Sequence, residues 1–168
     1  MTLVAATPEL VEADLKDRAA LAGLLGAKVP DNWPPDLYER QAMQVALEQL
    51  RSPVDQAGWS FWYLLTRSME KPQVLGICGF KGRPDESGSV EIGYSVLSQY
   101  RVNGYASEAV TRLISWAFSH QNVTEVCAET LPHLRQSIRV MEKNGFTFTG
   151  SGSEQGVVRY AVQRPDQR

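Results

Sequence analysis

Cysteine and histidine are scarce in this chain of 168 residues, which contains two of each. Cys78 and Cys127 lie inside apolar segments, so a disulfide framework or a cysteine-based zinc site is poorly supported, and we expect two buried thiols. His120 and His133 are too few for a histidine-rich metal site. The sequence therefore predicts no metal centre.

Long apolar runs are also absent. Nowhere do about eighteen apolar residues follow one another, and the first residues have no basic segment followed by a continuous apolar stretch. We therefore expect a soluble cytoplasmic protein with no membrane partner. The net charge of −2 argues against a general nucleic-acid surface.

What is present is an ordinary globular composition, with 43% apolar and 21% charged residues and no low-complexity run or repeat. A chain of this length can bury a sizeable core but is too short to expect two domains. We predict a single domain over residues 1–168.

The first third of the chain predicts one strand and two helices. Residues 1–7 are typical of a short strand, and Thr7 followed by Pro8 predicts the start of a helix that runs to about Leu25. Three prolines make residues 26–36 a loop. A second helix is expected from about Leu37 to Leu50.

The remainder is dominated by β-branched and aromatic runs with two helical segments between them. The first three runs are separated by turn-like sequences, which predicts successive antiparallel strands. Gly145 is expected to be the left-handed cap of the last helix. The expected strands are 59–66, 73–80, 89–97, 124–130, 146–152 and 157–164, and the expected helices are 105–120 and 135–144.

This order of elements predicts an α+β fold, with a central mixed sheet of about seven strands and about four helices on its two faces. The helix at 105–120 would be a crossover between the strands at 89–97 and 124–130. A helical crossover makes the strands that it joins parallel.

The segment QYRVNGYASEA, residues 99–109, joins a strand to a helix. Amides at a helix start lack intrahelical partners, and the helix dipole favours an anion there. Gly104 and Ala106 leave those amides uncovered, and Arg101 can add a full charge. The alternative is a plain turn glycine with a solvated arginine. A P-loop and a three-glycine dinucleotide motif are both excluded.

The pattern Arg101-x-x-Gly104-x-Ala106, following EIGYSVL and opening a helix, resembles the signature of the GNAT superfamily of acyl-CoA-dependent N-acyltransferases. The flanking segments VEIGYSVLSQYRVNGYASEAVTRLISWAF and VCAETLPHLRQSIRVMEKNGFTFTG are similar to the branch that contains ribosomal-protein alanine acetyltransferases. The likeness is clear from about residue 74 to 150. The order of elements extends it to nearly the whole chain.

The resemblance implies that the pyrophosphate of acetyl-CoA binds at this turn and that the pantetheine arm adds to the sheet like a strand where the sheet splays. The backbone of Ser95, Val96 and Leu97 would bond the arm, and Ser107 could add a hydroxyl to the phosphate site. The residues expected at the pyrophosphate are Arg101, Val102, Asn103, Gly104, Tyr105 and Ala106.

An amine attacks a thioester only as the free base, so a proton acceptor is needed. Glu91 is the first candidate, because it shares one side of its strand with Gly93 and Ser95 and the family often has an acid there. The alternative is a salt-bridged edge residue. Glu129 is the second candidate for the base and an acceptor-site residue, and it could equally be structural.

The leaving thiolate also needs a proton or a hydrogen bond. Ser137 matches the serine that follows the fifth strand in this branch, whereas a simple helix-start hydroxyl is the alternative. Relatives commonly have Asn three residues before that serine, where this chain has Leu134. A strand amide near Val96 or Leu97 could stabilise the oxyanion.

In this family the first two helices, their loop and the final strands form the acceptor site. Trp33 is the favoured wall residue, because it lies in the proline-rich loop. The other aromatic candidates are expected mostly in the core. They are Tyr38, Trp59, Trp62 and Tyr94.

The resemblance therefore implies an N-acetyltransferase that passes the acetyl group of acetyl-CoA to a primary amine by direct attack in a ternary complex. The amine could be a protein N-terminus or a small molecule. An acyl-CoA-binding regulatory module without turnover is the alternative. The sequence leaves the acceptor and the oligomeric state open, a homodimer included.

Overall fold

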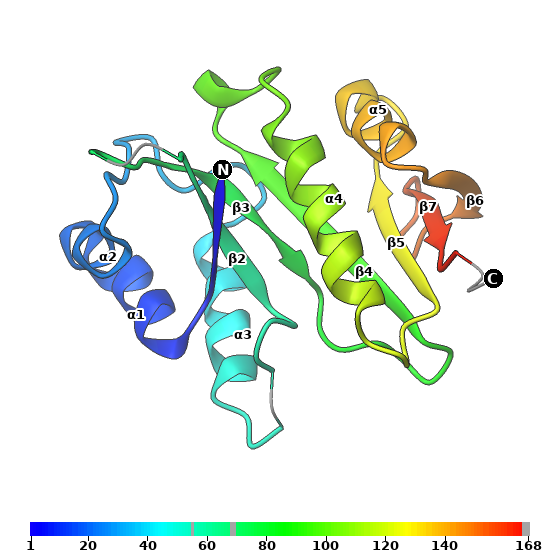
Figure 1. Ribbon diagram of the computed structural model, residues 1–168, viewed down its shortest axis with the longest axis horizontal. Helices are drawn as coiled ribbons and strands as arrows, with labels where there is room; N and C mark the ends of the chain where they lie inside the picture. The colour runs from blue at the N-terminus through cyan, green and yellow to red at the C-terminus, as the bar shows by residue number, and fades with distance from the viewer. Residues whose placement is uncertain (55, 68–69, 166–168) are drawn as a thin grey trace.

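A computed structural model describes residues 1–54, 56–67 and 70–165. Its centre is a seven-stranded sheet with the order β1-β2-β3-β4-β5-β7-β6 (Figure 1). The mixed α/β architecture confirms the predicted fold class. The described residues form five α-helices, one more than expected.

The first four strands form an antiparallel half-sheet, of which β2, β3 and β4 are the three successive antiparallel strands that the sequence predicts. Each strand pairs with the next one along the chain. Short connections join β2 to β3 and β3 to β4, whereas three helices separate β1 from β2 in the chain. The strands are β1 (Thr2–Ala5), β2 (Phe61–Leu65), β3 (Val74–Phe80) and β4 (Ser89–Val96).

The crossover prediction is also confirmed. Helix α4 (Tyr105–Phe118) connects β4 to β5 (Glu125–Thr130), and these two strands are parallel. Helix α5 (Arg135–Lys143) follows, and β6 (Thr147–Ser151) and β7 (Val158–Gln163) complete the sheet as antiparallel strands.

The pairing of β4 with β5 is short. It covers only Ser89–Glu91 against Glu125–Cys127, although both strands continue well beyond it. Past Glu91 the two strands separate, which confirms the expected splay between them. We call this diverging region the splay.

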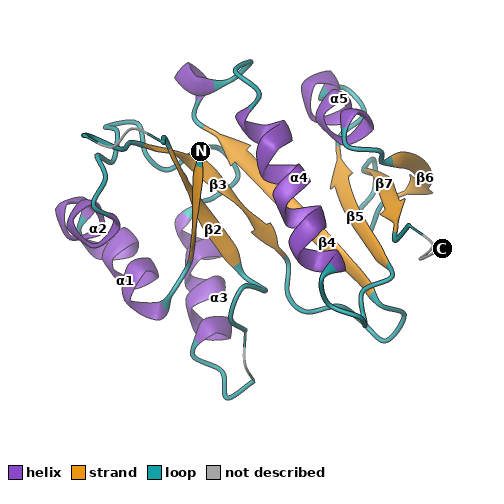
Figure 2. Ribbon diagram, viewed as in Figure 1, coloured by secondary structure: helices purple, strands orange, loops and turns teal. Residues whose placement is uncertain are grey.

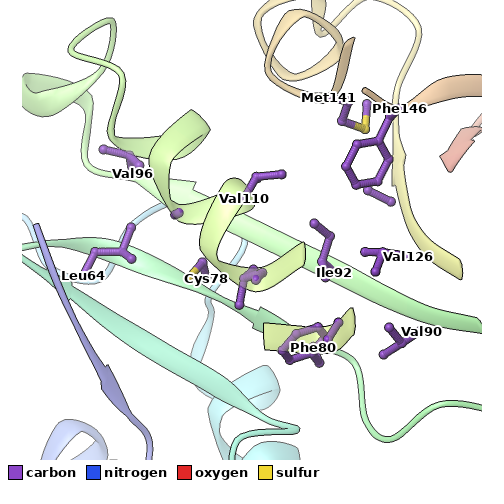
Figure 3. Close-up of a cluster of buried hydrophobic side chains, with 14 of the residues drawn as sticks. Leu64, Cys78, Phe80, Val90, Ile92, Val96, Val110, Val126, Met141 and Phe146 are labelled. Atoms are coloured by element: carbon purple, nitrogen blue, oxygen red, sulfur yellow. The ribbon is translucent and has the colours of Figure 1, made fainter. Parts of the chain in front are cut away.

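Helices cover both faces of the sheet. α4 lies across one face, over β4 (Figure 2), and shares a core with α5 that includes Val90, Ile92, Val110 and Met141 (Figure 3). The opposite core packs α1 (Pro8–Lys16), α2 (Arg18–Leu25) and α3 (Arg40–Leu50) against Phe61, Tyr63 and Ile77. Successive strand residues thus supply two separate cores.

Two helix boundaries differ from the sequence prediction. The helix expected from Pro8 to Leu25 is two helices, because Asp17 leaves the helical conformation and its carboxylate accepts the Ala19 amide at 2.9 Å as the cap of α2. α3 begins at Arg40, not at Leu37, which has a left-handed φ of 72°.

The predicted helix caps at both ends of the chain are confirmed. Thr7 Oγ1 accepts the amide of Leu10 at 3.2 Å, with Pro8 in the first helical position. Gly145 has a φ of 84° after α5, and Phe146 donates its amide to Met141 O at 3.1 Å. This is a Schellman arrangement, in which glycine satisfies carbonyls at the helix end.

Candidate active site

A cavity of about 1370 Å³ lies at the splay. Its walls come from both sides of the sheet: residues of α3 and the loop before it on one side, and residues of α4 and α5 on the other. β4 runs between them, with Glu91, Gly93 and Ser95 on the α3 side and Tyr94 packed toward the α4 core. The splay therefore joins two half-sites across the sheet.

The start of α4 leaves backbone amides uncapped on the α4 side of the cavity. Gly104 is the N-cap residue with a φ of 82°, and no side chain caps the helix. The first amide bonded within the helix is that of Glu108, which donates to Gly104 O at 2.9 Å. The amides of Tyr105, Ala106 and Ser107 precede it at the cavity wall.

Asn103 and Val102 shape this turn. The Asn103 side-chain amide donates to the carbonyls of Tyr100 and Arg101 at 3.2 and 3.0 Å, so both carbonyls have a partner within the turn. Val102 has a left-handed φ of 64° and a side chain that is 94% exposed. The hydrogen bonds of Asn103 and the left-handed Val102 thus fix the backbone of the turn before α4.

Arg101 lines the cavity, and its guanidinium already has partners within the chain. Its Nε donates to Val96 O at 2.9 Å, and its Nη2 lies 2.6 Å from the Asp36 carboxylate. The guanidinium therefore ties the turn to the end of β4 and to the loop before α3. Because Asp36 is 78% exposed, this ion pair contributes only about 0–1 kcal/mol.

Helix α5 supplies the cations that sequence reasoning missed. Arg135, Arg139 and Lys143 are four residues apart, line the cavity and make no ion pair among the described residues. The end of this helix lies beside α4, because Asn144 Nδ2 donates to Ser107 Oγ at 3.1 Å. The i, i+4, i+8 spacing in RQSIRVMEK could have revealed this row.

The backbone groups that face the splay are not the predicted set. The Leu97 amide donates to Leu75 O, and the Lys81 amide donates to Glu91 O, each at 2.9 Å. The backbone N–H and C=O groups of Glu91, and of every second residue after it, therefore point toward β3. Because these groups alternate in direction along a strand, the backbone N–H and C=O groups of Tyr94 and Val96 point toward the splay. The expectation is corrected for Ser95 and Leu97 and kept for Val96, whose carbonyl Arg101 already binds.

Ser137 lies on the α5 side of the splay. The Tyr94 hydroxyl donates to Ser137 O at 3.0 Å and lies 3.0 Å from Ser137 Oγ. Ser137 is the third residue of α5, and Leu134, the N-cap residue, makes no side-chain capping bond, so the serine is not the helix-start cap considered as the alternative. Burial raises the pKa of Tyr94 more than contact with Ser137 lowers it.

Glu91 lines the cavity on the α3 side. It is not an edge residue, because β4 lies in the middle of the sheet. Lys81 forms an ion pair with Oε1, yet this buried oxygen has no aligned hydrogen bond to any described residue. The carboxylate thus retains capacity for a further donor.

Glu129 also borders the cavity, but its carboxylate is occupied. It accepts the backbone amide of Ser153 at 3.0 Å and the Ser153 hydroxyl at 2.7 Å, and Arg159 lies 3.5 Å away. Burial works to raise the pKa of Glu129, but the bonds from Ser153 and the nearby cations hold it below the usual value. These contacts favour the structural alternative, an anchor for the loop between β6 and β7.

The structure does not bring Trp33 into the cavity. Its ring is buried against Tyr63, and its Nε1 donates to Asp14 at 2.7 Å. Trp59 is likewise in the core, and Trp62 donates to Gly58 O. The aromatic residues that do line the cavity include Tyr38 and Tyr94, which sequence reasoning had considered and set aside.

The two cysteines are buried thiols without a disulfide, as expected, and burial raises the pKa of each. Among residues 1–54, 56–67 and 70–165, no group of three or more His, Cys, Asp and Glu side chains is arranged to hold a metal ion. Nor does any helix in these ranges have the length and apolar character needed to cross a membrane.

Comparison with known proteins identifies the family. The acetyltransferase (GNAT) domain model matches residues 9–147. The uncharacterized N-acetyltransferase YjdG of Bacillus subtilis is 30% identical over 148 residues, which are 88% of this chain and 85% of that protein.

Two solved structures share the fold. One is the ribosomal-protein-S5-alanine acetyltransferase of Vibrio fischeri, with a TM-score of 0.67 and 17% identity over 99% of this chain and 94% of that one. The other is the aminoglycoside acetyltransferase AAC(6')-Ib in complex with coenzyme A, with a TM-score of 0.63 and 17% identity over 97% and 94%. With its family-model match and its splayed sheet, this chain belongs to the GNAT acetyltransferases and is an acyl-CoA-dependent enzyme.

Proposed function

We propose that this enzyme transfers the acetyl group of acetyl-CoA to a primary amine by direct attack, with both substrates bound at once. The observation that carries the proposal is the cavity that joins the two faces of the sheet. Uncapped amides and unpaired cations lie on one side of it, and the Glu91 carboxylate lies on the other.

The α4 side is suited to coenzyme A. The pyrophosphate would accept hydrogen bonds from the amides of Tyr105, Ala106 and Ser107, where the helix dipole adds about half a positive charge. The row of Arg135, Arg139 and Lys143 would contact the remaining phosphate charge. The amide-rich pantetheine arm would bond the backbone of β4 that faces the splay, at Tyr94 and at the amide of Val96, whose carbonyl is bound by Arg101.

The α3 side is suited to an amine acceptor. Glu91 accepts the proton that the nitrogen loses as the new C–N bond forms. The C–S bond then breaks, and the coenzyme A thiolate leaves toward Ser137 and Tyr94, whose hydroxyl groups can stabilise or protonate it. The products are an acetylated amine and free coenzyme A.

The acceptor wall of α3 is apolar in character. Ala42, Val45 and Ala46 line the cavity at i, i+3 and i+4, and Gln49 completes that face. Each cavity carboxylate already has a cation beside it: Asp36 has Arg101, Glu91 has Lys81 and Glu129 has Arg159. These features support an acceptor with one amine on an apolar body over a polycation.

The proposal is tested by measuring thiol release from acetyl-CoA with a panel of amines. The panel contains an alanine-initiated peptide, benzylamine, spermidine and kanamycin, and mass spectrometry detects the acetylated products. We expect turnover with the peptide or benzylamine. Coenzyme A binding in calorimetry without product from any amine would instead support a regulatory module.

A further inference from the structure

The hydroxyl of Tyr38 is an unused polar group in the acceptor half of the cavity. It has no hydrogen-bond partner within the described part of the chain. Leu37, with its left-handed φ of 72°, turns the backbone immediately before it, and the Tyr38 ring packs on the edge of Phe61 with centroids 6.2 Å apart. Burial raises the pKa of this hydroxyl well above its usual range, so it stays a neutral O–H.

Gly93 lies opposite this hydroxyl on β4. A Cβ placed at Gly93 would lie 3.7 Å from Tyr38 Oη, with no other atom within 4 Å. The φ of Gly93 is not left-handed, so the backbone conformation does not require glycine here. A glycine inside a central strand often marks a place where a ligand approaches the backbone closely.

Glu91 is on the same side of β4 as Gly93, two residues before it. Side chains at this spacing are about 6.6 Å apart along a strand. The open space over Gly93 is therefore bordered by a carboxylate at one end and by a phenol oxygen at the other. Both oxygen atoms can accept a hydrogen bond from a nitrogen placed between them.

We propose that Tyr38 and Glu91 together hold the acceptor nitrogen over Gly93, so that Tyr38 is an acceptor-binding residue and Gly93 sets the space for a primary amine. The inference rests on the proposed function. A free primary amine has two N–H groups and one lone pair. When Glu91 accepts from one N–H and Tyr38 Oη from the other, the lone pair is left to attack the thioester carbon.

The arrangement also predicts selectivity between amines. A secondary amine has only one N–H, and its extra substituent would replace a hydrogen bond at Glu91 or at Tyr38. In the step itself, the nitrogen gives one proton to Glu91 as the C–N bond forms and the C–S bond breaks. Tyr38 keeps its proton throughout.

The first test is Tyr38→Phe, which removes the hydroxyl and keeps the ring. For each primary amine that reacts, we expect kcat/KM to fall about tenfold, as for the loss of one hydrogen bond. The preference for the amine over its N-methyl derivative should fall as well, and the Kd for coenzyme A should not change. The matched control is Tyr63→Phe, whose hydroxyl bonds Asp14 at 2.9 Å outside the cavity and should affect stability only.

The second test is Gly93→Ala. The added methyl would be in ordinary contact with Tyr38 Oη, so we expect an unchanged melting temperature and coenzyme A affinity but at least about a hundredfold lower kcat/KM. Wild-type kinetics for both variants, or an unchanged preference for primary amines in Tyr38→Phe, would overturn the inference. Wild-type protein that binds coenzyme A but acetylates no amine would instead overturn the proposed function, and this inference with it.

Discussion

The Tyr94 hydroxyl and the Ser137 side chain meet across the splay, with the two oxygen atoms 3.0 Å apart. One belongs to β4 and the other to α5, so the contact joins β4 to the helix that follows β5, in the region where β4 and β5 are no longer paired. It places two hydroxyl groups at the cavity, where the proposed mechanism requires a proton or a hydrogen bond for the leaving thiolate.

The Tyr94 and Ser137 hydroxyls are expected to act as a unit in catalysis. Ser137→Ala and Tyr94→Phe should each lower kcat by about 10-fold, since each removes a hydrogen bond that strengthens as charge develops on sulfur. The double variant should be little worse than either one, because the two groups share one contact. Single-turnover kinetics of the three variants checks this prediction. Fully additive losses in the double variant would show that the two hydroxyls act independently.

Gly104→Val should weaken coenzyme A binding by at least about tenfold, because the side chain would cover the uncapped amides of α4. The left-handed φ of 82° also makes any Cβ unfavourable by about 1–2 kcal/mol. Gly156→Val is the matched control: its φ is 83°, its Cβ would also meet nothing within 4 Å, and it lies outside the cavity lining. Calorimetric titration should detect weakened binding only at Gly104.

Glu91→Gln should lower turnover by about 100-fold or more while the affinity for coenzyme A is kept. The loss should be largest at low pH, because amines with pKa values of about 8 to 10.4 are then mostly protonated and depend most on a base. Lys81→Met is the control, since it breaks the ion pair and leaves the carboxylate in place. A parallel pH–rate profile for Glu91→Gln and wild type would exclude Glu91 as the base.

The α5 cations predict a salt-dependent affinity for coenzyme A. Arg139→Gln should weaken binding several-fold at low salt, and the difference from wild type should shrink as salt approaches about 1 M, where the screening length is about 3 Å. Arg112→Gln is a suitable control, because that side chain is paired with Glu108 and lies outside the cavity lining. An effect of Arg139→Gln that salt does not change would contradict a phosphate contact.

Two carboxylates should give pH dependences of opposite sign in the free energy of unfolding. Burial raises the pKa of Asp14 above 3.8, despite hydrogen bonds from Trp33 and Tyr63. Between pH 3.8 and the folded pKa, the folded state therefore binds more protons than the unfolded state does. The stability that Asp14 contributes therefore falls as pH rises from 3.8 through the folded pKa.

Glu129 behaves in the opposite way, because its folded pKa lies below 4.5. Its contribution is complete above 4.5 and is lost as pH falls through the folded pKa. Denaturant titrations between about pH 3 and 7 on wild type, Asp14→Asn and Glu129→Gln give the two differences. If the difference in unfolding free energy between wild type and variant changed with pH in the same direction for both residues, the opposite pKa shifts of Asp14 and Glu129 would be contradicted.

Much of the fold could be predicted from local patterns. Runs of β-branched and aromatic residues between turn-like sequences indicated the strands, and Thr7, Pro8 and Gly145 indicated helix ends whose caps the structure confirms. The division at Asp17 was missed, because an aspartate within an apolar helical pattern can either remain in a helix or cap a new one. The choice depends on how the two halves pack.

The residue pattern itself predicted the part of the candidate site that belongs to one continuous segment, whereas Glu91 and Ser137, which also line the cavity, were expected from the family resemblance. The turn from Arg101 to Ser107 is such a segment, and its backbone geometry follows from Gly104. The contact of Arg101 with Asp36 was not predicted, because Asp36 is 65 residues away and nothing local indicates it. Trp33 was misplaced for the same reason, since its partner Asp14 is reached only through packing.

The sequence by itself therefore determined the elements, the parallel crossover and the uncapped start of α4, because each depends on residues close together in the chain. Only the tertiary structure decided which backbone groups of β4 face the splay, that Glu129 is held by Ser153, and that Tyr38 lies over Gly93. Those outcomes depend on register and on packing between distant segments. A local pattern carries no information about either.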